Sequence, residues 1–381
     1  MIDWHGPGLN IGDLHVRIPI VQGGMGIGVS GRRLAAAVAA QGGVGVLSSV
    51  GIGYIGIPLT DAHAIALAKQ RNENKNISVL RQEIRAAKRM TKGVLGVNIM
   101  VAISEFAQTA KAAVEEGIDI IFAGAGLPLD LPECLKDGGR TKLVPIISSP
   151  RAAALITKRW MSKYKYCPDA FVLEGPKAGG HLGFSKEKTE DPASQLEALV
   201  PEVVREINKM EQEIGKEIPL IAAGGIFTGE DIHRMMALGA AGVQMGTRFV
   251  ATEECDAAPA FKEAYVNCTQ KDIALIESPV GLPGRALMND FLREAKGGLH
   301  HPKSCPRHCI KTCDGEKAPY CISSALIHAY FGKFEKGFAF VGSNGWRVRE
   351  ITTVEKLFSE LTREFNEAVD GAAARRREGI K

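Results

Sequence analysis

The chain has 381 residues, a formal net charge of +4, 45% hydrophobic residues and 24% charged residues. The near-neutral charge argues against a nucleic-acid surface, and the apolar content argues against disorder. No apolar run reaches the roughly 18 residues of a membrane span, and the first residues lack the pattern of a secretion signal. We therefore expect a cytoplasmic protein with a small-molecule substrate and with neither nucleic acid nor membrane as a partner. Two features need explaining, the 43 glycines and the 8 cysteines.

Eight short apolar runs follow one another along the chain. They are continuous rather than alternating, which is typical of parallel strands buried on both faces. Several of them end in Gly, Ser or Asn. The eight predicted strands lie at residues 18–23, 44–50, 95–100, 120–126, 142–148, 170–175, 218–225 and 242–250.

Stretches with helical periodicity separate most of these strands. A strand-then-helix unit repeated eight times predicts an α/β fold, a parallel TIM (β/α)8 barrel, with catalytic groups at the C-terminal ends of the strands. The alternative is an open doubly wound sheet, which wants GxGxxG after its first strand. Gly24 and Gly26 fit that spacing, but Val29 stands where the third glycine belongs. The predicted helices lie at 31–41, 76–90, 105–116, 150–161, 195–214 and 229–238.

The last predicted barrel strand ends near residue 250, which leaves a long C-terminal part. We predict a barrel over 1–255 and a C-terminal helical appendage over 256–381, which carries a cysteine segment and packs on the barrel. Helical spacing recurs in the appendage at 261–266, 323–331 and 354–369. The sequence leaves the oligomeric state open, and a dimer contact through the appendage is one alternative.

Glycines end the seventh and eighth predicted strands. Gly224 and Gly225 follow strand seven, and Gly246 and Thr247 follow strand eight. The loops after these two strands often bind phosphate in such barrels. Glycine lets backbone N–H groups approach the phosphate, and a helix N-terminus adds positive potential. The pattern therefore predicts a phosphorylated ligand.

Three further side chains stand at the ends of predicted strands. His181 lies in a glycine-rich loop after strand six, where an imidazole can act as a general base or as a hydrogen-bond donor to a developing anion. Met25, beside glycine, suits contact with a flat aromatic ring. The Asn98 amide can hydrogen-bond both donors and acceptors of a heterocycle. These residues are candidates for a ligand site.

Together these motifs resemble the 2-nitropropane dioxygenase (nitronate monooxygenase) family, whose relatives include flavin-dependent enoyl-acyl-carrier-protein reductases and NADH:quinone reductases. The resemblance implies an FMN-bearing TIM barrel in which His181 is the catalytic residue above the flavin. It rests on residues 19–25, 96–99, 178–181, 222–226, 244–248 and 278–286. The cofactor contacts that we predict from it are Gly24, Met25, Asn98, Glu174, Gly179, Gly180, Gly224, Gly225, Gln244, Met245, Gly246 and Thr247.

Two positions depart from the family pattern. Many members have Gln where this chain has Glu174, and Glu or Ser where it has Lys177. A carboxylate beside a flavin is costly without a partner, and Lys177 or a ribityl hydroxyl would supply one. The departures bear on the substrate more than on the cofactor.

The resemblance implies an oxidoreductase, and we predict FMN-dependent oxidation of alkyl nitronates with O2, His181 being the catalytic base. The alternative is an NAD(P)H-dependent flavin reductase of an enoyl-acyl-carrier-protein or a quinone. No basic run is visible for an acidic carrier protein, which favours the nitronate prediction. A flavin- or phosphate-binding scaffold without turnover is a third hypothesis.

Half of the cysteines lie in one segment with the spacing Cx3Cx3Cx7C, namely Cys305, Cys309, Cys313 and Cys321. Thiolates so close together are candidate ligands of Zn or an iron–sulfur cluster. On a helix, the first three would share a face. The alternative is reduced structural thiols, because disulfides are rare in the cytosol.

Overall fold

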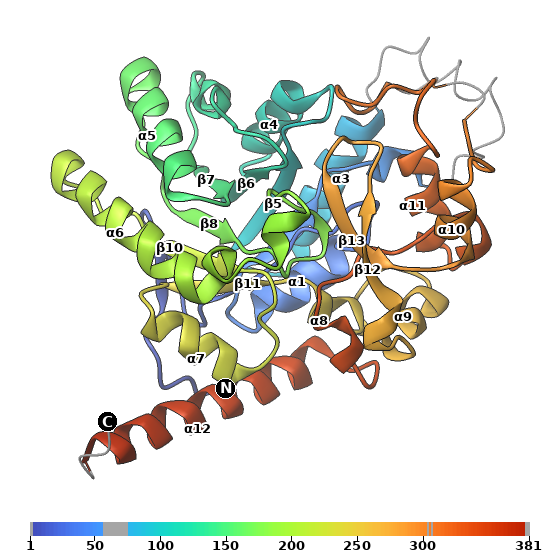
Figure 1. Ribbon diagram of the computed structural model, residues 1–381. Coiled ribbons are helices and arrows are strands. Elements are labelled where there is room, and N and C mark those ends of the chain that lie inside the picture. The colour runs from blue at the N-terminus through green and yellow to red at the C-terminus, as the bar shows by residue number, and fades with distance from the viewer. Residues whose placement is uncertain (1–2, 56–74, 303–304, 306–307, 378–381) are drawn as a thin grey trace.

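The computed structural model describes residues 3–55, 75–302, 305 and 308–377. Its centre is an eight-stranded parallel sheet in the order β3-β11-β10-β8-β7-β6-β5-β4. The sheet closes on itself because Val21 bridges Val44, whose amide donates to Ile20 O at 2.9 Å. The predicted barrel is therefore confirmed, and every predicted strand is present (Figure 1). The strands are β3 (Ile20–Gln22), β4 (Gly45–Ser48), β5 (Leu95–Met100), β6 (Ile120–Gly124), β7 (Lys142–Ile147), β8 (Phe171–Glu174), β10 (Leu220–Ala223) and β11 (Gly242–Met245).

All six predicted barrel helices form, with start signals that the sequence carries. Ser149 caps α5 and accepts from the Ala152 amide at 3.3 Å, and Thr228 forms a capping box with Asp231 on α7. Between β6 and β7 the chain makes a 3-10 turn, Leu131–Leu135, instead of an α-helix. The helices are α1 (Arg32–Ala40), α3 (Lys75–Met90), α4 (Phe106–Glu115), α5 (Pro150–Tyr164), α6 (Leu196–Ile214) and α7 (Gly229–Ala237).

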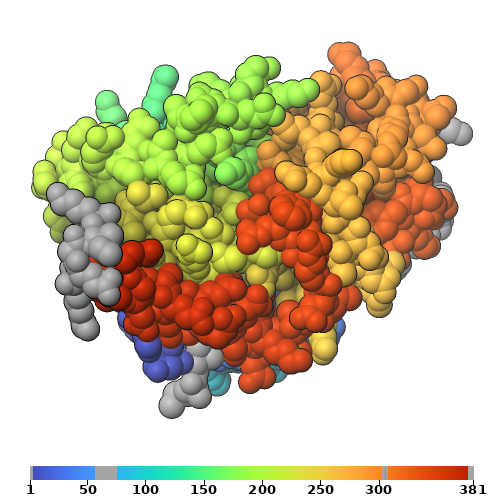
Figure 2. All heavy atoms as spheres, turned by 60° about the horizontal axis from the view of Figure 1, so that its bottom comes forward, coloured from blue at the N-terminus to red at the C-terminus, as the bar shows by residue number. Residues whose placement is uncertain are grey.

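The C-terminal helix α12 (Val354–Arg377) packs on the outside of the barrel against α7 and α1. Gly229 permits the close approach, since a Cβ there would lie 2.2 Å from Leu361 O, and its amide donates to Glu364 Oε2 at 2.7 Å. Figure 2 shows this red helix lying against the yellow segment around α7. Only the short helix α8 (Thr247–Val250) follows β11, so α12 fills the position in the outer layer between α7 and α1.

The residues between the short helix α8 (Thr247–Val250) and α12 lie beside the barrel (Figure 1). The predicted appendage contains the expected helices, and it also contains strands. A β-hairpin within it adds to β9 of the barrel part, forming the antiparallel sheet β12-β13-β9. The division at residue 255 stays a prediction. The additional elements are α9 (Pro259–Val266), β12 (Ile273–Glu277), β13 (Pro283–Leu287), α10 (Asp290–Lys296), α11 (Ile322–Tyr330) and β9 (Gly180–His181).

The inside of the barrel is filled by apolar side chains. Val21, Val46, Phe122 and Val172 are fully buried in one cluster. An N-terminal hairpin, β1 (Leu9–Ile11) and β2 (Leu14–Val16), belongs to the same cluster. With the interior filled, ligands have access at the strand ends. Within the described ranges, no helix is both long and apolar enough for a transmembrane span.

Candidate active site

One cavity lies at the C-terminal ends of the barrel strands. His181 and the twelve predicted cofactor contacts all line it, although they come from five barrel strands, the two-residue strand β9 and the segments that follow them. The additional lining residues include Tyr265, Phe340 and Asn344, which come from the part after β11. The structure thus brings together the predicted catalytic and cofactor-binding residues, while the role of each stays a prediction.

His181 lies on the two-residue strand β9 and is held from two sides. Its Nε2 atom shares a hydrogen bond of 2.7 Å with Ser278 Oγ, at the end of β12. The ring also packs edge-on against Phe340, with 5.0 Å between centroids. Burial lowers the pKa of His181 to about 4, so the imidazole is neutral at pH 7. A neutral imidazole can either accept a proton or donate a hydrogen bond.

The loop before His181 is fastened to the hairpin by a buried arginine. Arg285 on β13 pairs with Gly180, and its Nη1 donates to Ala178 O at 2.8 Å and also to Pro176 O. No carboxylate pairs with Arg285 among the described residues, and burial lowers its pKa. The guanidinium therefore fixes the main chain of the loop. Arg285 does not line the cavity, whereas His181 does.

Glu174 ends β8 and faces the same cavity. Within the described part of the chain, its carboxyl group has neither a hydrogen bond nor an ion pair, and the suggested pairing with Lys177 is not found. Burial raises the pKa of Glu174 from 4.5 to about 7. The cavity therefore combines a neutral histidine with a carboxyl group that is close to half protonated at pH 7.

The loops after β10 and β11, where we predict the phosphate site, have open backbone. Gly224 and Gly225 adopt φ values of +98° and +84°, which residues other than glycine rarely adopt. A Cβ at Gly224 would also lie 2.8 Å from Gly175 O. Helix α8 begins at Thr247, whose Oγ1 accepts from the Gly342 amide at 3.1 Å. The open backbone and the helix start can both contact an anion.

The other end of the cavity offers a flat and partly polar surface. Gly24 allows close contact with Asn98, since a Cβ there would lie 2.2 Å from Asn98 Cβ. Met25 lies across from Gly246, with its Sδ 3.7 Å from the position of a Cβ on that glycine. The buried Nε2 of Gln244 has no hydrogen-bond partner in the described structure. A heterocycle with acceptor atoms, such as a flavin, fits this donor.

Three residues that support the site were given no role from sequence. Ser278 lies in a segment that contributed to the family resemblance, yet nothing local indicated a contact with His181, 97 residues away. Tyr265 donates to the carbonyl oxygen of Phe340, the residue that packs on His181. The pairing of β13 with β9 brings the hairpin to His181, and the bridge between Ala286 and Phe340 brings Phe340 to the same place.

The cysteine segment lies outside the cavity and packs on the barrel rim. Ile310 bridges Ile103, and the Ser104 amide donates to Cys309 O at 3.2 Å. The described residues of the segment are not helical, so the shared helical face is wrong for Cys305, Cys309 and Cys313. No disulfide joins the eight cysteines, and no metal-binding group of three or more side chains occurs in the described ranges. The structure thus does not support Zn or an iron–sulfur cluster at Cys305, Cys309, Cys313 and Cys321.

The fold and this site define a (β/α)8-barrel enzyme with its ligand cavity at the strand ends. The family model "Nitronate monooxygenase" matches residues 10–364, and the chain belongs to that family. It is therefore an oxidoreductase of a flavin-dependent family, which agrees with the predicted FMN.

Individual relatives carry two different activities. The chain is 28% identical, over 74% of its length and 66% of the relative's, to (3aS,4S,5R,7aS)-5-hydroxy-7a-methyl-1-oxo-octahydro-1H-indene-4-carboxyl-CoA dehydrogenase of Mycobacterium tuberculosis. That share is just under two thirds of the relative. The chain is also 28% identical to a probable nitronate monooxygenase of Staphylococcus aureus, over 74% of this chain and 78% of that one. The solved structure of FabK from Thermotoga maritima is similar with a TM-score of 0.71 at 28% identity, covering 94% and 96% of the two chains.

Proposed function

We propose that this enzyme binds FMN in the cavity and oxidises alkyl nitronates with O2, with His181 acting directly on the bound substrate. The observation that carries the proposal is a neutral histidine, held by Ser278, above a glycine-lined cavity that ends in a phosphate cradle. Membership of the nitronate monooxygenase family supports it. Bound FMN would supply a two-electron acceptor that can pass its electrons on to O2.

The side chains divide the binding of FMN between two ends of the cavity. Gly224, Gly225, Gly246 and Thr247 would hold the phosphate through open backbone and the start of α8. Met25, Asn98, Gly179 and Gly180 would contact the ring, and Gly24, Glu174 and Met245 complete the wall. Gln244 offers its free Nε2 to an acceptor of the cofactor.

His181 is better suited to a nitronate than to a neutral nitroalkane. Burial gives its neutral imidazole a pKa of about 4, so it is a weak base toward a C–H acid. A nitronate is already deprotonated and needs no strong base. The negative charge of a bound nitronate would raise the pKa of His181, so that it can hold a proton toward the nitro oxygens.

The second candidate is an NAD(P)H-dependent flavin reductase of an enoyl-acyl-carrier-protein or a quinone. The observation that favours it is the similarity to FabK over nearly the whole chain. In such a reaction a protonated Glu174 would be available as an acid in the cavity.

Anaerobic mixing separates the two candidates. The holoenzyme is mixed with propionate 3-nitronate or with NADH, and the absorbance of the bound flavin is followed. Rapid bleaching by the nitronate, abolished in His181→Ala but not in the exposed-residue control Lys186→Ala, supports the first proposal. Rapid bleaching by NADH and none by the nitronate refutes it.

A further inference from the structure

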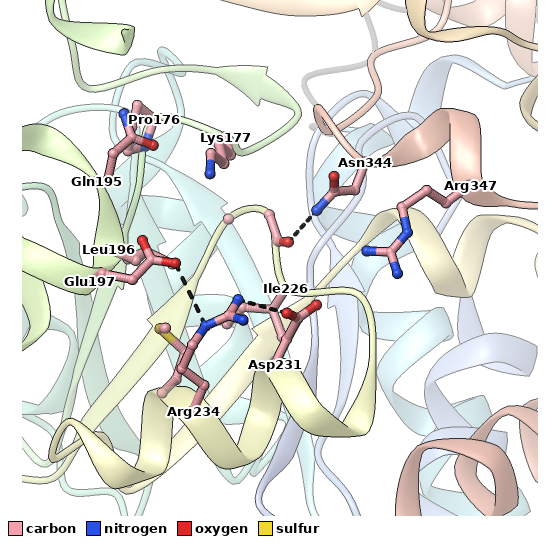
Figure 3. Close-up of a pocket in the computed structure, with 13 residues that line it drawn as sticks. Pro176, Lys177, Gln195, Leu196, Glu197, Ile226, Asp231, Arg234, Asn344 and Arg347 are labelled. Carbon is pink, nitrogen blue, oxygen red and sulfur yellow. Dashed lines mark hydrogen bonds and ion pairs between the residues drawn. The ribbon is translucent and has the colours of Figure 1, made fainter. Parts of the chain in front are cut away.

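A second cavity lies behind the phosphate cradle. It shares Gly224, Gly225, Ile226 and Asn344 with the main cavity. Its other walls come from the loop after β8, from the start of α6, from α7 and from Arg347. Asn344 Nδ2 donates to Gly225 O at 2.5 Å, so this side chain and the loop after β10 form the partition (Figure 3). A ligand here would lie beside the cofactor's phosphate rather than beside its ring.

Both carboxylates of the second cavity are engaged by one arginine. Arg234 Nη2 lies 2.6 Å from Asp231 Oδ1, and Arg234 Nε lies 3.6 Å from Glu197 Oε1 (Figure 3). Asp231 additionally accepts the Phe227 and Thr228 amides at the start of α7. One arginine offsets only one of these two negative charges, so the three cations and two acids that line the cavity leave it with a formal net charge of +1.

Two cations remain at the walls without a carboxylate partner in the described chain. Lys177 lies over Gly225, whose Cβ would be 2.8 Å from Lys177 Cβ, and Arg347 lies beyond Asn344 (Figure 3). Arg347 stacks on Phe227, with Cζ 4.5 Å from the ring centroid. On the same ring, Arg248 is neutralised by Glu360 at 2.8 Å, whereas Arg347 is not. A half-buried guanidinium held on an aromatic ring, and an ammonium group in the wall of the same cavity, are both suited to binding a phosphate.

The same cavity contains a hydrogen-bond acceptor without a partner in the described structure, the side-chain oxygen of Gln195. Gln195 lines the cavity, and its Nε2 donates to Thr189 O and Asp191 O at 3.2 and 3.1 Å, which fixes the amide. Its buried Oε1 has no partner in the described structure. A simple inorganic anion would leave this acceptor unpaired, whereas a sugar hydroxyl or an amine would satisfy it.

We propose that this second cavity binds the phosphate and ribose end of a nucleotide-bearing cosubstrate, with Lys177 and Arg347 on the phosphate and Gln195 on a hydroxyl or amine donor. This goes beyond the proposed oxidation of nitronates, which needs no nucleotide besides FMN. A coenzyme A thioester and a nicotinamide dinucleotide both carry this chemistry, and the test below distinguishes them.

The test is calorimetric titration of the FMN-loaded protein with 3′,5′-ADP, ADP-ribose and inorganic phosphate. Tighter binding of 3′,5′-ADP indicates a coenzyme A nucleotide, and tighter binding of ADP-ribose a nicotinamide dinucleotide. We expect Kd to rise about tenfold in Arg347→Ala and about threefold in Lys177→Ala, because the lysine is exposed and its charge is screened. Lys186→Ala, an exposed lysine on the same loop, serves as the control and leaves Kd unchanged.

Flavin content and circular dichroism are measured on every variant, and Arg347→Gln is included because Arg347 also packs on Phe227. Retained fold and flavin with weakened nucleotide binding support the proposal. It is overturned if neither nucleotide binds at millimolar concentration, if inorganic phosphate binds as tightly as the nucleotides, or if the variants lose FMN instead. Nitronate oxidation without added nucleotide is measured on the same preparations, so failure of the proposed function is seen separately.

Discussion

Replacing Glu174 by Gln tests the electrostatics of the cavity directly. Gln keeps the size and hydrogen-bonding capacity of the side chain but cannot ionise. In the folded protein without flavin, burial raises the pKa of Glu174 from 4.5 to about 7. The folded state therefore favours the neutral acid, and ionisation of this group destabilises the fold.

The size of the effect follows from linkage. A rise from 4.5 to about 7, at 1.36 kcal/mol per pH unit, corresponds to about 3 kcal/mol. Below pH 4.5 both states are protonated and the cost is absent. It grows between pH 4.5 and 7, as the unfolded chain ionises first, and is fully present above pH 7. The Gln variant avoids this cost.

The assay is urea unfolding of the flavin-free protein at pH 5 and pH 8. We expect Glu174→Gln to raise the free energy of unfolding by about 3 kcal/mol at pH 8 and by less than 1 kcal/mol at pH 5. Glu190→Gln, an exposed glutamate in the following loop, is the matched control. Equal effects of Glu174→Gln at the two pH values would show that the carboxyl group is not desolvated and would refute the reasoning.

The remaining predictions concern the histidine, the cradle and the thiols. Ser278→Ala removes the 2.7 Å bond to His181 and should lower kcat for nitronate oxidation about tenfold with flavin content unchanged; an unchanged kcat would contradict the positioning role. Gly225→Ala forces a Cβ to 2.8 Å from Lys177 Cβ at φ +84°, so Kd for FMN, measured by fluorescence quenching, should rise at least about tenfold. Elemental analysis should find neither Zn nor Fe, whereas either one in stoichiometric amount would assign the cysteine segment to a metal.

Much of the barrel could be predicted because its signals are local. Buried parallel strands are continuously apolar, so runs such as 95–100 coincide with β5 to the residue. The glycines after β10 were also a local signal, since Gly224 and Gly225 adopt positive φ angles that residues with a side chain rarely adopt. The helix predicted at 354–369 is also present, within α12.

The hairpin β12-β13 could not be predicted in the same way. Its first strand is only half-buried and its turn contains Pro and Gly, so neither a buried nor an alternating pattern is evident. Strand β9 has two residues, too few for any periodicity. The cysteine spacing indicated a metal or a helical face, while the described segment is an irregular strand-like stretch on the barrel rim.

The sequence by itself therefore determined the barrel, its strand ends and the set of residues around the cavity, because each of these depends on local patterns of burial and backbone freedom. Only the tertiary structure decided which side chains contact one another and which charged groups lack a partner. Ser278 reaches His181 only through the pairing of β13 with β9, and α12 reaches α7 only by returning from the end of the chain. The ionisation of Glu174 and the free charges of Lys177 and Arg347 likewise depend on which groups are absent nearby. Such distances between segments remote in sequence are set by packing, and no local pattern encodes them.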